Sequence, residues 1–171
     1  MKTIKFITGS ALFCALLIGV QLALSGVPGI VLVTAFFLAF CFCMGVLQGV
    51  VVGVSFSLLR CLLFGFFPTV IILYLLYYSL FALVFGFVGK KFGNQPSPVA
   101  LFTVIVLSVL MTAIFSLMDD VITPLVFGFD KNAFVAYFYS SLAFMLPQCV
   151  CAAVSVGLLF IPLVKTFSLL K

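Results

Sequence analysis

The chain has 171 residues, of which 67% are hydrophobic and only 6% are charged, and its mean hydropathy is +1.54. Such a chain has too few polar side chains to cover an apolar core in water, which excludes a water-soluble globular protein. The net charge of +5 comes from basic residues scattered singly or in pairs. That arrangement indicates membrane orientation rather than nucleic-acid binding. We therefore predict an all-α membrane protein in which residues 1–171 form one domain.

Apolar runs long enough to cross a bilayer alternate with short connections. They predict a bundle of six transmembrane helices with short loops, over the ranges Phe6–Leu24, Ile30–Met44, Val46–Phe64, Thr69–Val88, Val99–Met118 and Ala133–Val164. The first run, preceded by Lys2 and Lys5, is similar to a signal peptide, but its length and the apolar sequence after it favour an uncleaved helix. A turn is expected at Ser25–Gly29. The last run exceeds one crossing, so we expect it to begin above the membrane, to tilt, or to kink near Pro147.

Basic residues predict the orientation of these spans. The termini and the connections on their side carry six of the eight basic residues, and the other side carries Arg60 and one lysine. Because cytoplasmic loops are enriched in Lys and Arg, we expect both termini in the cytoplasm. All three acidic residues then lie outside, at Asp119, Asp120 and Asp130. Asp130 is also, with Asn132, a candidate N-cap of the last helix.

Glycines indicate where helices pack closely. Gly45, Gly49 and Gly53 recur at intervals of four residues, which places them on one face of the third predicted helix. Small side chains on such a face let a neighbouring backbone approach. We therefore expect this helix to pack tightly on a neighbour.

The residue types disfavour an enzyme or a metal protein. The chain has no histidine, and its six cysteines all lie inside apolar runs, where they are best interpreted as small buried hydrophobes. Asp119 and Asp120 are neighbours in sequence and point about 100° apart on a helix, so they do not form a facing catalytic pair. We expect no catalytic residue, no metal ligand and no cofactor.

Three predicted helices each carry a polar or aromatic face. In the fifth, Ser108, Thr112 and Ser116 follow at steps of four residues and lead to the two adjacent aspartates. Similar spacing relates Tyr74, Tyr77 and Tyr78 in the fourth helix, and Tyr137, Ser141, Gln148 and Ser155 in the sixth. Polar stripes do not face lipid, so we predict an outward-opening cavity between these helices. Its expected solute-binding residues are Arg60, Tyr74, Tyr78, Thr112, Ser116, Asp119, Asp120, Tyr137 and Ser141.

Simpler roles stay open for these residues. The hydroxyl groups can bond to carbonyls of their own helix or to a neighbouring helix. Arg60 either extends to the outer interface, pairs with Asp119 or Asp120, or binds an anionic group of a ligand. The two aspartates can also form a solvated charge pair near a helix end, and Tyr74 can belong to an interfacial belt.

Six short apolar helices with almost no soluble loops resemble the S component, the substrate-binding subunit, of energy-coupling factor (ECF) vitamin transporters. The first helix contains Ala11-Leu12-Phe13-Cys14-Ala15, which matches the A-x-x-x-A motif of that family. The turn Phe64–Pro68 and the tail Phe160–Lys165 are also similar to the family in style. Nickel and cobalt components of this kind use an N-terminal histidine, which this chain lacks.

The resemblance implies a function for the whole chain. An S component captures a vitamin or related small molecule outside and delivers it inward, without catalysis of its own, and no phosphate-binding G-x-x-x-x-G-K-S/T stretch occurs here. It implies docking through Ala11 and Ala15 onto a transmembrane coupling subunit, which is driven by two cytoplasmic ATPases. The expected location is the plasma membrane of a bacterial cell. The alternative is a structural or assembly membrane protein that transports no ligand.

Overall fold

The computed structural model describes residues 2–24, 32–93 and 95–169, and within them every regular element is a helix. The helices are α1 (Lys2–Ala23), α2 (Leu32–Met44), α3 (Val46–Phe64), α4 (Pro68–Lys91), α5 (Pro98–Phe127) and α6 (Lys131–Ser168). The described part of the chain therefore confirms an all-helical architecture. The predicted turn Ser25–Gly29 lies outside the described residues.

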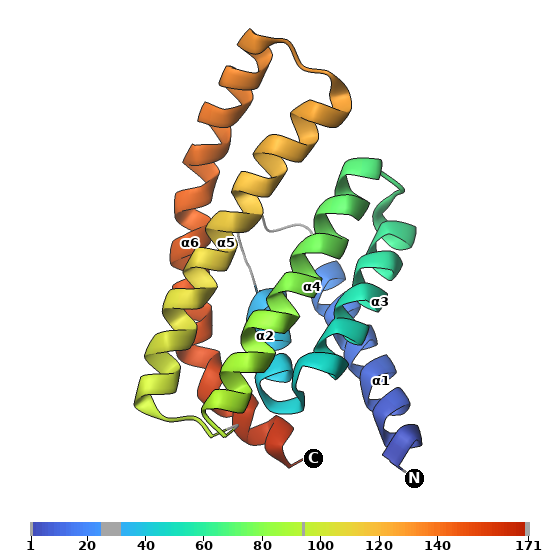
Figure 1. The fold of residues 1–171 in the computed structure, drawn as a ribbon, viewed down its shortest axis with the longest axis vertical. Coiled ribbons are helices and arrows are strands. Elements are labelled where there is room, and N and C mark those ends of the chain that lie inside the picture. The colour runs from blue at the N-terminus through green and yellow to red at the C-terminus, as the bar shows by residue number, and fades with distance from the viewer. Residues whose placement is uncertain (1, 25–31, 94, 170–171) are drawn as a thin grey trace.

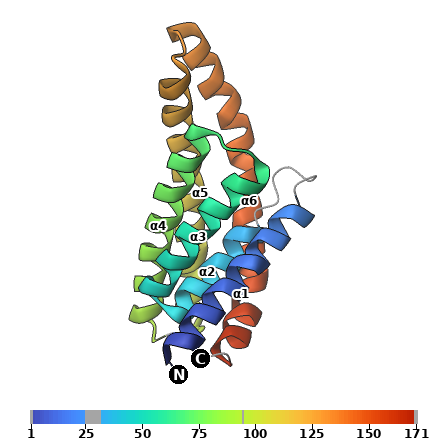
Figure 2. The same cartoon turned by 90° about the vertical axis from the view of Figure 1, so that its right-hand side faces the viewer.

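The helices run alternately in opposite directions, so the two ends of the chain lie at the same end of the bundle (Figures 1 and 2). We call this the terminal end, and the other the acidic end. The long helix α5 packs along α6, α3 packs along α4, and α2 lies against both α4 and α6. Helix α1 covers α3 and α2 from the outside.

Five of the described helices are long and apolar enough to cross a membrane, whereas α2 is shorter. Its 13 residues span about 20 Å, less than the roughly 30 Å of a hydrocarbon core. It is also the most enclosed helix: every residue from Phe37 to Cys43 is buried. The second predicted span is thus a short central helix around which the longer ones pack.

The predicted end of the fifth helix was wrong. Helix α5 does not end at Met118 but continues through both adjacent aspartates to Phe127, with Pro124 inside it. A proline removes one backbone donor from a helix, and continuing the helix satisfies the other backbone groups. Gly128 ends the helix with a left-handed backbone (φ 64°), and the Phe129 N–H bonds to the Pro124 carbonyl at 3.0 Å.

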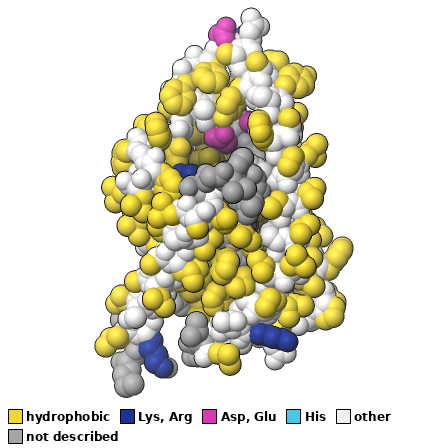
Figure 3. Space-filling view, turned by 180° about the vertical axis from the view of Figure 1, so that it is seen from behind, with side chains coloured by type: hydrophobic (Ala, Val, Ile, Leu, Met, Phe, Trp, Pro, Cys, Tyr) yellow, Lys and Arg dark blue, Asp and Glu magenta, His cyan; other side chains and the backbone are white. Residues whose placement is uncertain are grey.

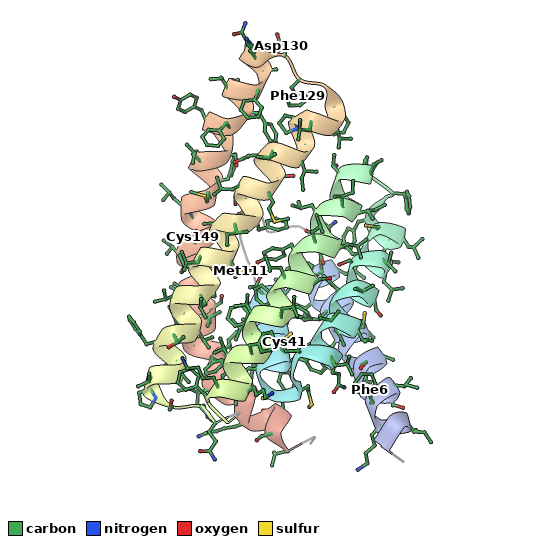
Figure 4. All side chains as sticks on the ribbon, viewed as in Figure 1. Phe6, Cys41, Met111, Phe129, Asp130 and Cys149 are labelled. Carbon is green, nitrogen blue, oxygen red and sulfur yellow. The ribbon has the colours of Figure 1, made fainter. Side chains whose placement is uncertain are left out.

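Helix α6 begins one residue after Asp130, whose side chain accepts a 2.9 Å hydrogen bond from the Ala133 N–H. Asp130 is therefore the N-cap, one of the two predicted candidates. The 38 residues of α6 extend about 57 Å and continue past Pro147 as helix. In consequence the α5–α6 hairpin projects beyond the α3–α4 connection, with Phe129 and Asp130 at its tip (Figures 1 and 4).

Phenylalanine rings fill the half of the bundle nearer the terminal end. Phe13 of α1 stacks on Phe40 of α2 with ring centroids 4.0 Å apart, and Phe42 packs edge-on against Phe160 of α6 at 5.0 Å. In α5 and α6 the apolar core residues lie between Ala100 and Met111 and between Val156 and Phe167. The acidic half of the α5–α6 pair therefore contributes no fully buried side chain to this core, although the partly buried Phe115 packs against it.

Small residues bring three helices close together. A methyl group added to Gly49 would lie 2.8 Å from the Cys41 sulfur, and one added to Gly53 would lie 3.2 Å from the Tyr78 carbonyl oxygen. This confirms the predicted packing face for two of its three glycines. Gly45 instead joins α2 to α3 with φ 89° and has open space around it. Gly86 of α4, which the spacing did not reveal, lies against the backbone of Val46.

We expect Gly86→Ala to destabilise the protein by about 1–3 kcal/mol, because its methyl group would lie 2.7 Å from the Val46 backbone nitrogen and force the helices apart. Gly19→Ala is the matched control. Gly19 is an exposed helical glycine with nothing within 4 Å of an added methyl group, so alanine there should be neutral or stabilising. Thermal unfolding in detergent measures both changes. Equal effects of the two substitutions would contradict the close α3–α4 packing.

Candidate functional site

The polar stripe of α5 faces the interior of the bundle. Ser108, Thr112, Ser116 and Asp120 are all buried, as their four-residue spacing predicted. The three hydroxyl groups donate to carbonyls of their own helix, with oxygen–oxygen distances of 2.8, 2.9 and 3.4 Å. The simpler interpretation of their donors is therefore correct. Their lone pairs remain available as acceptors.

Asp119 is half-buried at the contact between α5 and α6. One carboxylate oxygen accepts a 2.8 Å hydrogen bond from the Tyr137 hydroxyl of α6, and the other accepts a 2.8 Å bond from Thr123, one turn later in α5. Hydrogen bonds to a charged acceptor are among the stronger ones in proteins. Asp119 therefore links the two helices. The alternative of a solvated charge pair near a helix end is wrong, because α5 continues past Asp119 to Phe127 and both of its oxygens are hydrogen-bonded.

Asp120 has a different environment. Its side chain is only 1% exposed, and neither carboxylate oxygen has a hydrogen-bond partner among the described residues. Ser141 of α6 is a polar neighbour of this carboxyl group, although the two are not in hydrogen-bonding geometry. A buried carboxyl group without a donor is costly in an apolar bundle, and residues of this kind usually serve a function.

A cavity of about 250 Å³ lies between α5 and α6 in the acidic half of the bundle. Its polar walls come from Ser116 and Asp119 on one side and from Tyr137, Ser140 and Ser141 on the other. We call it the hairpin cavity. It brings four of the predicted solute-binding residues together. In Figure 3, acidic side chains gather above a hollow in the back face of the molecule, with a basic side chain beside it.

A second cavity, of about 200 Å³, lies at the centre of the bundle, and we call it the aromatic cavity. The side chains that line it come from α1, α2, α4, α5 and α6. They are Gln21, Leu24, Val33, Thr34, Tyr74, Tyr77, Tyr78, Thr112, Phe115 and Gln148. Phe115 and Gln148 border the hairpin cavity as well, so the two cavities are neighbours.

Aromatic rings form one wall of the aromatic cavity. Phe115 of α5 lies 4.7 Å from the Tyr77 ring and 5.6 Å from the Tyr74 ring, centroid to centroid. Tyr78 is buried against Phe37 and Phe56 at 5.3 and 5.0 Å. Since the three tyrosines line the inner cavity, Tyr74 does not belong to a lipid-facing belt.

Arg60 of α3 does not form either predicted ion pair. Asp119 receives its hydrogen bonds from neutral hydroxyl groups, and Asp120 receives none from a described residue. The guanidinium carbon instead lies 4.0 Å from the centre of the Tyr74 ring, a cation–π contact. The buried Arg60 Nε has no hydrogen-bond partner within the described residues, so this side chain retains an unused donor beside the aromatic cavity.

No protein-family model, curated protein or solved structure matches the chain. Its sequence and its own geometry therefore carry the functional argument.

Three contributors to the cavities were not selected at the level of sequence. Gln21 lines the aromatic cavity, and its amide oxygen is buried without a hydrogen-bond partner among the described residues. Gln148 was placed on the polar face of the last helix but was not selected as a binding residue. An amide inside an apolar span is itself a signal, because burying it without a partner is unfavourable. Ser140 also lines the hairpin cavity.

A larger hollow lies elsewhere and is a different kind of surface. It is an open groove of about 770 Å³ along α6, bordered by Val150, Val154 and Leu158. Nearly all of its exposed wall is apolar. It offers little to a polar solute, and a lipid chain or a neighbouring helix would fit it better.

Proposed function

We propose that the chain is the substrate-binding subunit of an importer of the ECF type, and that it captures a small vitamin-like molecule from outside the cell. The two neighbouring cavities are the observation that supports this proposal. Polar side chains line both cavities inside an apolar bundle, and the buried amide oxygen of Gln21 in the aromatic cavity has no partner among the described residues. A bound solute would supply partners to such groups. The distribution of basic residues supports an orientation with the termini in the cytoplasm and these cavities toward the outside.

The proposed partners are a transmembrane coupling subunit and two cytoplasmic ATPases in a bacterial plasma membrane. Ala11 and Ala15 of α1 are exposed, and Gly19 continues the same strip at the next four-residue step. Small side chains on an outward face leave room for a partner helix to approach closely. This surface is consistent with the docking role that the resemblance implies.

The second candidate function is that of a structural or assembly protein. The close contacts at the glycines favour it, because they pack helices together and need no ligand. A purely structural bundle would be expected to fill its interior with apolar side chains, as the terminal half does. The acidic half instead encloses polar cavities. We therefore favour solute binding.

Native mass spectrometry of the protein purified from its own membranes tests the proposal. We expect the protein to carry a small molecule, and Gln148→Leu, at the border of both cavities, to lose it. Thr103→Val is the control, because Thr103 bonds only to its own helix carbonyl outside both cavities. Protein that carries only lipid, or a small molecule retained equally by both variants, would contradict solute binding at this site.

A further inference from the structure

Three of the four hydroxyl groups that line the hairpin cavity already donate hydrogen bonds within the protein. Tyr137 and Thr123 use their hydroxyl hydrogens on Asp119. The Ser140 hydroxyl lies 2.9 Å from the carbonyls of both Ala136 and Tyr137, and Ser116 donates to its own helix as well. These hydroxyl groups therefore turn lone pairs rather than hydrogens toward a ligand.

The acidic side chains of the same region receive no hydrogen bond from a cationic group within the described part of the chain. The donors to Asp119 are neutral, and both oxygens of the buried Asp120 lack any described partner. Pro124 lies four residues after Asp120 and has no N–H, so the backbone carbonyl of Asp120 also loses its usual helical donor. Ser141, which lines the cavity, is the polar neighbour of the Asp120 carboxyl group, so this group lies just behind the cavity wall.

We infer that the solute carries a protonated amine, which binds in the hairpin cavity against Asp119 and the surrounding hydroxyl oxygens, with Asp120 behind the cavity wall, and that its apolar or aromatic part lies in the aromatic cavity. This inference rests on the proposed function. An ammonium group has three donors and no acceptor, which complements a site with unused acceptors and uncompensated acidic groups.

An organic amine fits better than a metal ion. No group of three or more acidic, cysteine or histidine side chains capable of holding a metal occurs among the described residues. The neighbouring cavity offers the rings of Tyr74, Tyr77 and Phe115. Such rings favour apolar and planar groups and also attract cations. The volumes of about 250 and 200 Å³ favour a small molecule that occupies both cavities.

Ligand-dependent thermal stability tests the inference without knowledge of the natural solute. The buried cysteines, such as Cys41 and Cys61, react with a thiol-sensitive dye only on unfolding, so they report the transition. The probes are phenethylamine, the neutral 2-phenylethanol, the anionic 3-phenylpropionate and sodium chloride. We expect phenethylamine to raise the unfolding temperature at a concentration about tenfold lower than the alcohol, and the other two to have no effect.

Substitutions of the aspartates test whether the stabilisation by phenethylamine depends on the hairpin cavity. Asp120→Asn should remove the preference for the amine over the alcohol. Asp130→Asn should keep it, because Asp130 caps α6 at the hairpin tip and asparagine caps helices equally well. A preference for the amine that persists in Asp120→Asn would overturn the inference. So would stabilisation by sodium chloride equal to that by the amine, which would assign the acidic groups to an inorganic cation.

The probes also separate this inference from the proposed function. Stabilisation by the carboxylate alone, if Tyr74→Leu abolishes it, would refute the amine while supporting solute binding in the aromatic cavity. If no probe stabilises the protein but native mass spectrometry finds a retained non-amine, the inference fails and the function stands. If no probe stabilises it and no small molecule is retained, both fail.

Discussion

Asp119→Asn is expected to destabilise the empty protein, whereas Asp120→Asn should leave its stability unchanged or raise it. Asp119 accepts two hydrogen bonds of 2.8 Å, one of them across the α5–α6 contact. Asparagine keeps one carbonyl oxygen and turns an N–H donor toward the other hydroxyl. Because each bond to a carboxylate contributes about 1.5–3 kcal/mol, the partly exposed Asp119 should lose roughly 1–3 kcal/mol in total.

The opposite expectation for Asp120 follows from its lack of partners. Its carboxyl group is buried with no donor on either oxygen among the described residues, so a neutral amide of the same shape removes a possible buried charge and breaks no bond. Both substitutions should nevertheless weaken solute binding, by about 1.5–3 kcal/mol if a charged hydrogen bond to the ligand is lost. Asp120→Asn would thus separate binding from stability.

Thermal unfolding of the two variants, together with the amount of small molecule that each retains, measures both effects. Asp130→Asn serves as the control for loss of a carboxylate at an exposed cap. Destabilisation by Asp120→Asn as large as that by Asp119→Asn would mean that Asp120 has a stabilising partner in the folded protein. If both variants retain as much small molecule as the unsubstituted protein, the two aspartates have a structural role and do not bind the solute.

The sequence predicted the interior face of α5 because side-chain periodicity is a local property. Ser108, Thr112 and Ser116 are buried as their spacing required, and Asp120 extends the same row. The end of α5 was less predictable. Charged residues and a proline favour a helix end, but backbone hydrogen bonding continued the helix past them to Gly128. The acidic stretch is consequently a helical wall of the cavity rather than a loop above it.

Partners across the bundle could not be predicted from spacing. The bond from Tyr137 to Asp119 depends on how far α6 rises beside α5, and the contact of Arg60 with Tyr74 depends on the pairing of α3 with α4. Charge complementarity left a pair between Arg60 and an aspartate as one of three open alternatives. In the structure the guanidinium group of Arg60 instead makes a cation–π contact with the Tyr74 ring. The two aspartates therefore receive no hydrogen bond from a cationic side chain of the described chain. That difference led to the proposed class of ligand.

Ala11→Trp combined with Ala15→Trp is expected to abolish uptake while leaving solute binding intact. Both alanines are exposed on α1, away from the two cavities, so the larger rings can extend outward without disturbing the bundle. On a docking face the same rings would prevent close approach of a partner helix. Leu12→Trp together with Leu16→Trp is the matched control, since these exposed residues neighbour the strip but point in another direction.

Three measurements on the two double variants test the docking surface: retention of the small molecule by native mass spectrometry, co-purification of the coupling subunit and ATPases, and uptake of the retained molecule by cells. The alanine variant should keep the first and lose the other two, and the leucine variant should keep all three. Normal uptake by the variant with Ala11→Trp and Ala15→Trp would show that α1 is not the docking surface. Loss of retention would instead indicate that α1 supports the aromatic cavity through Gln21 and Leu24.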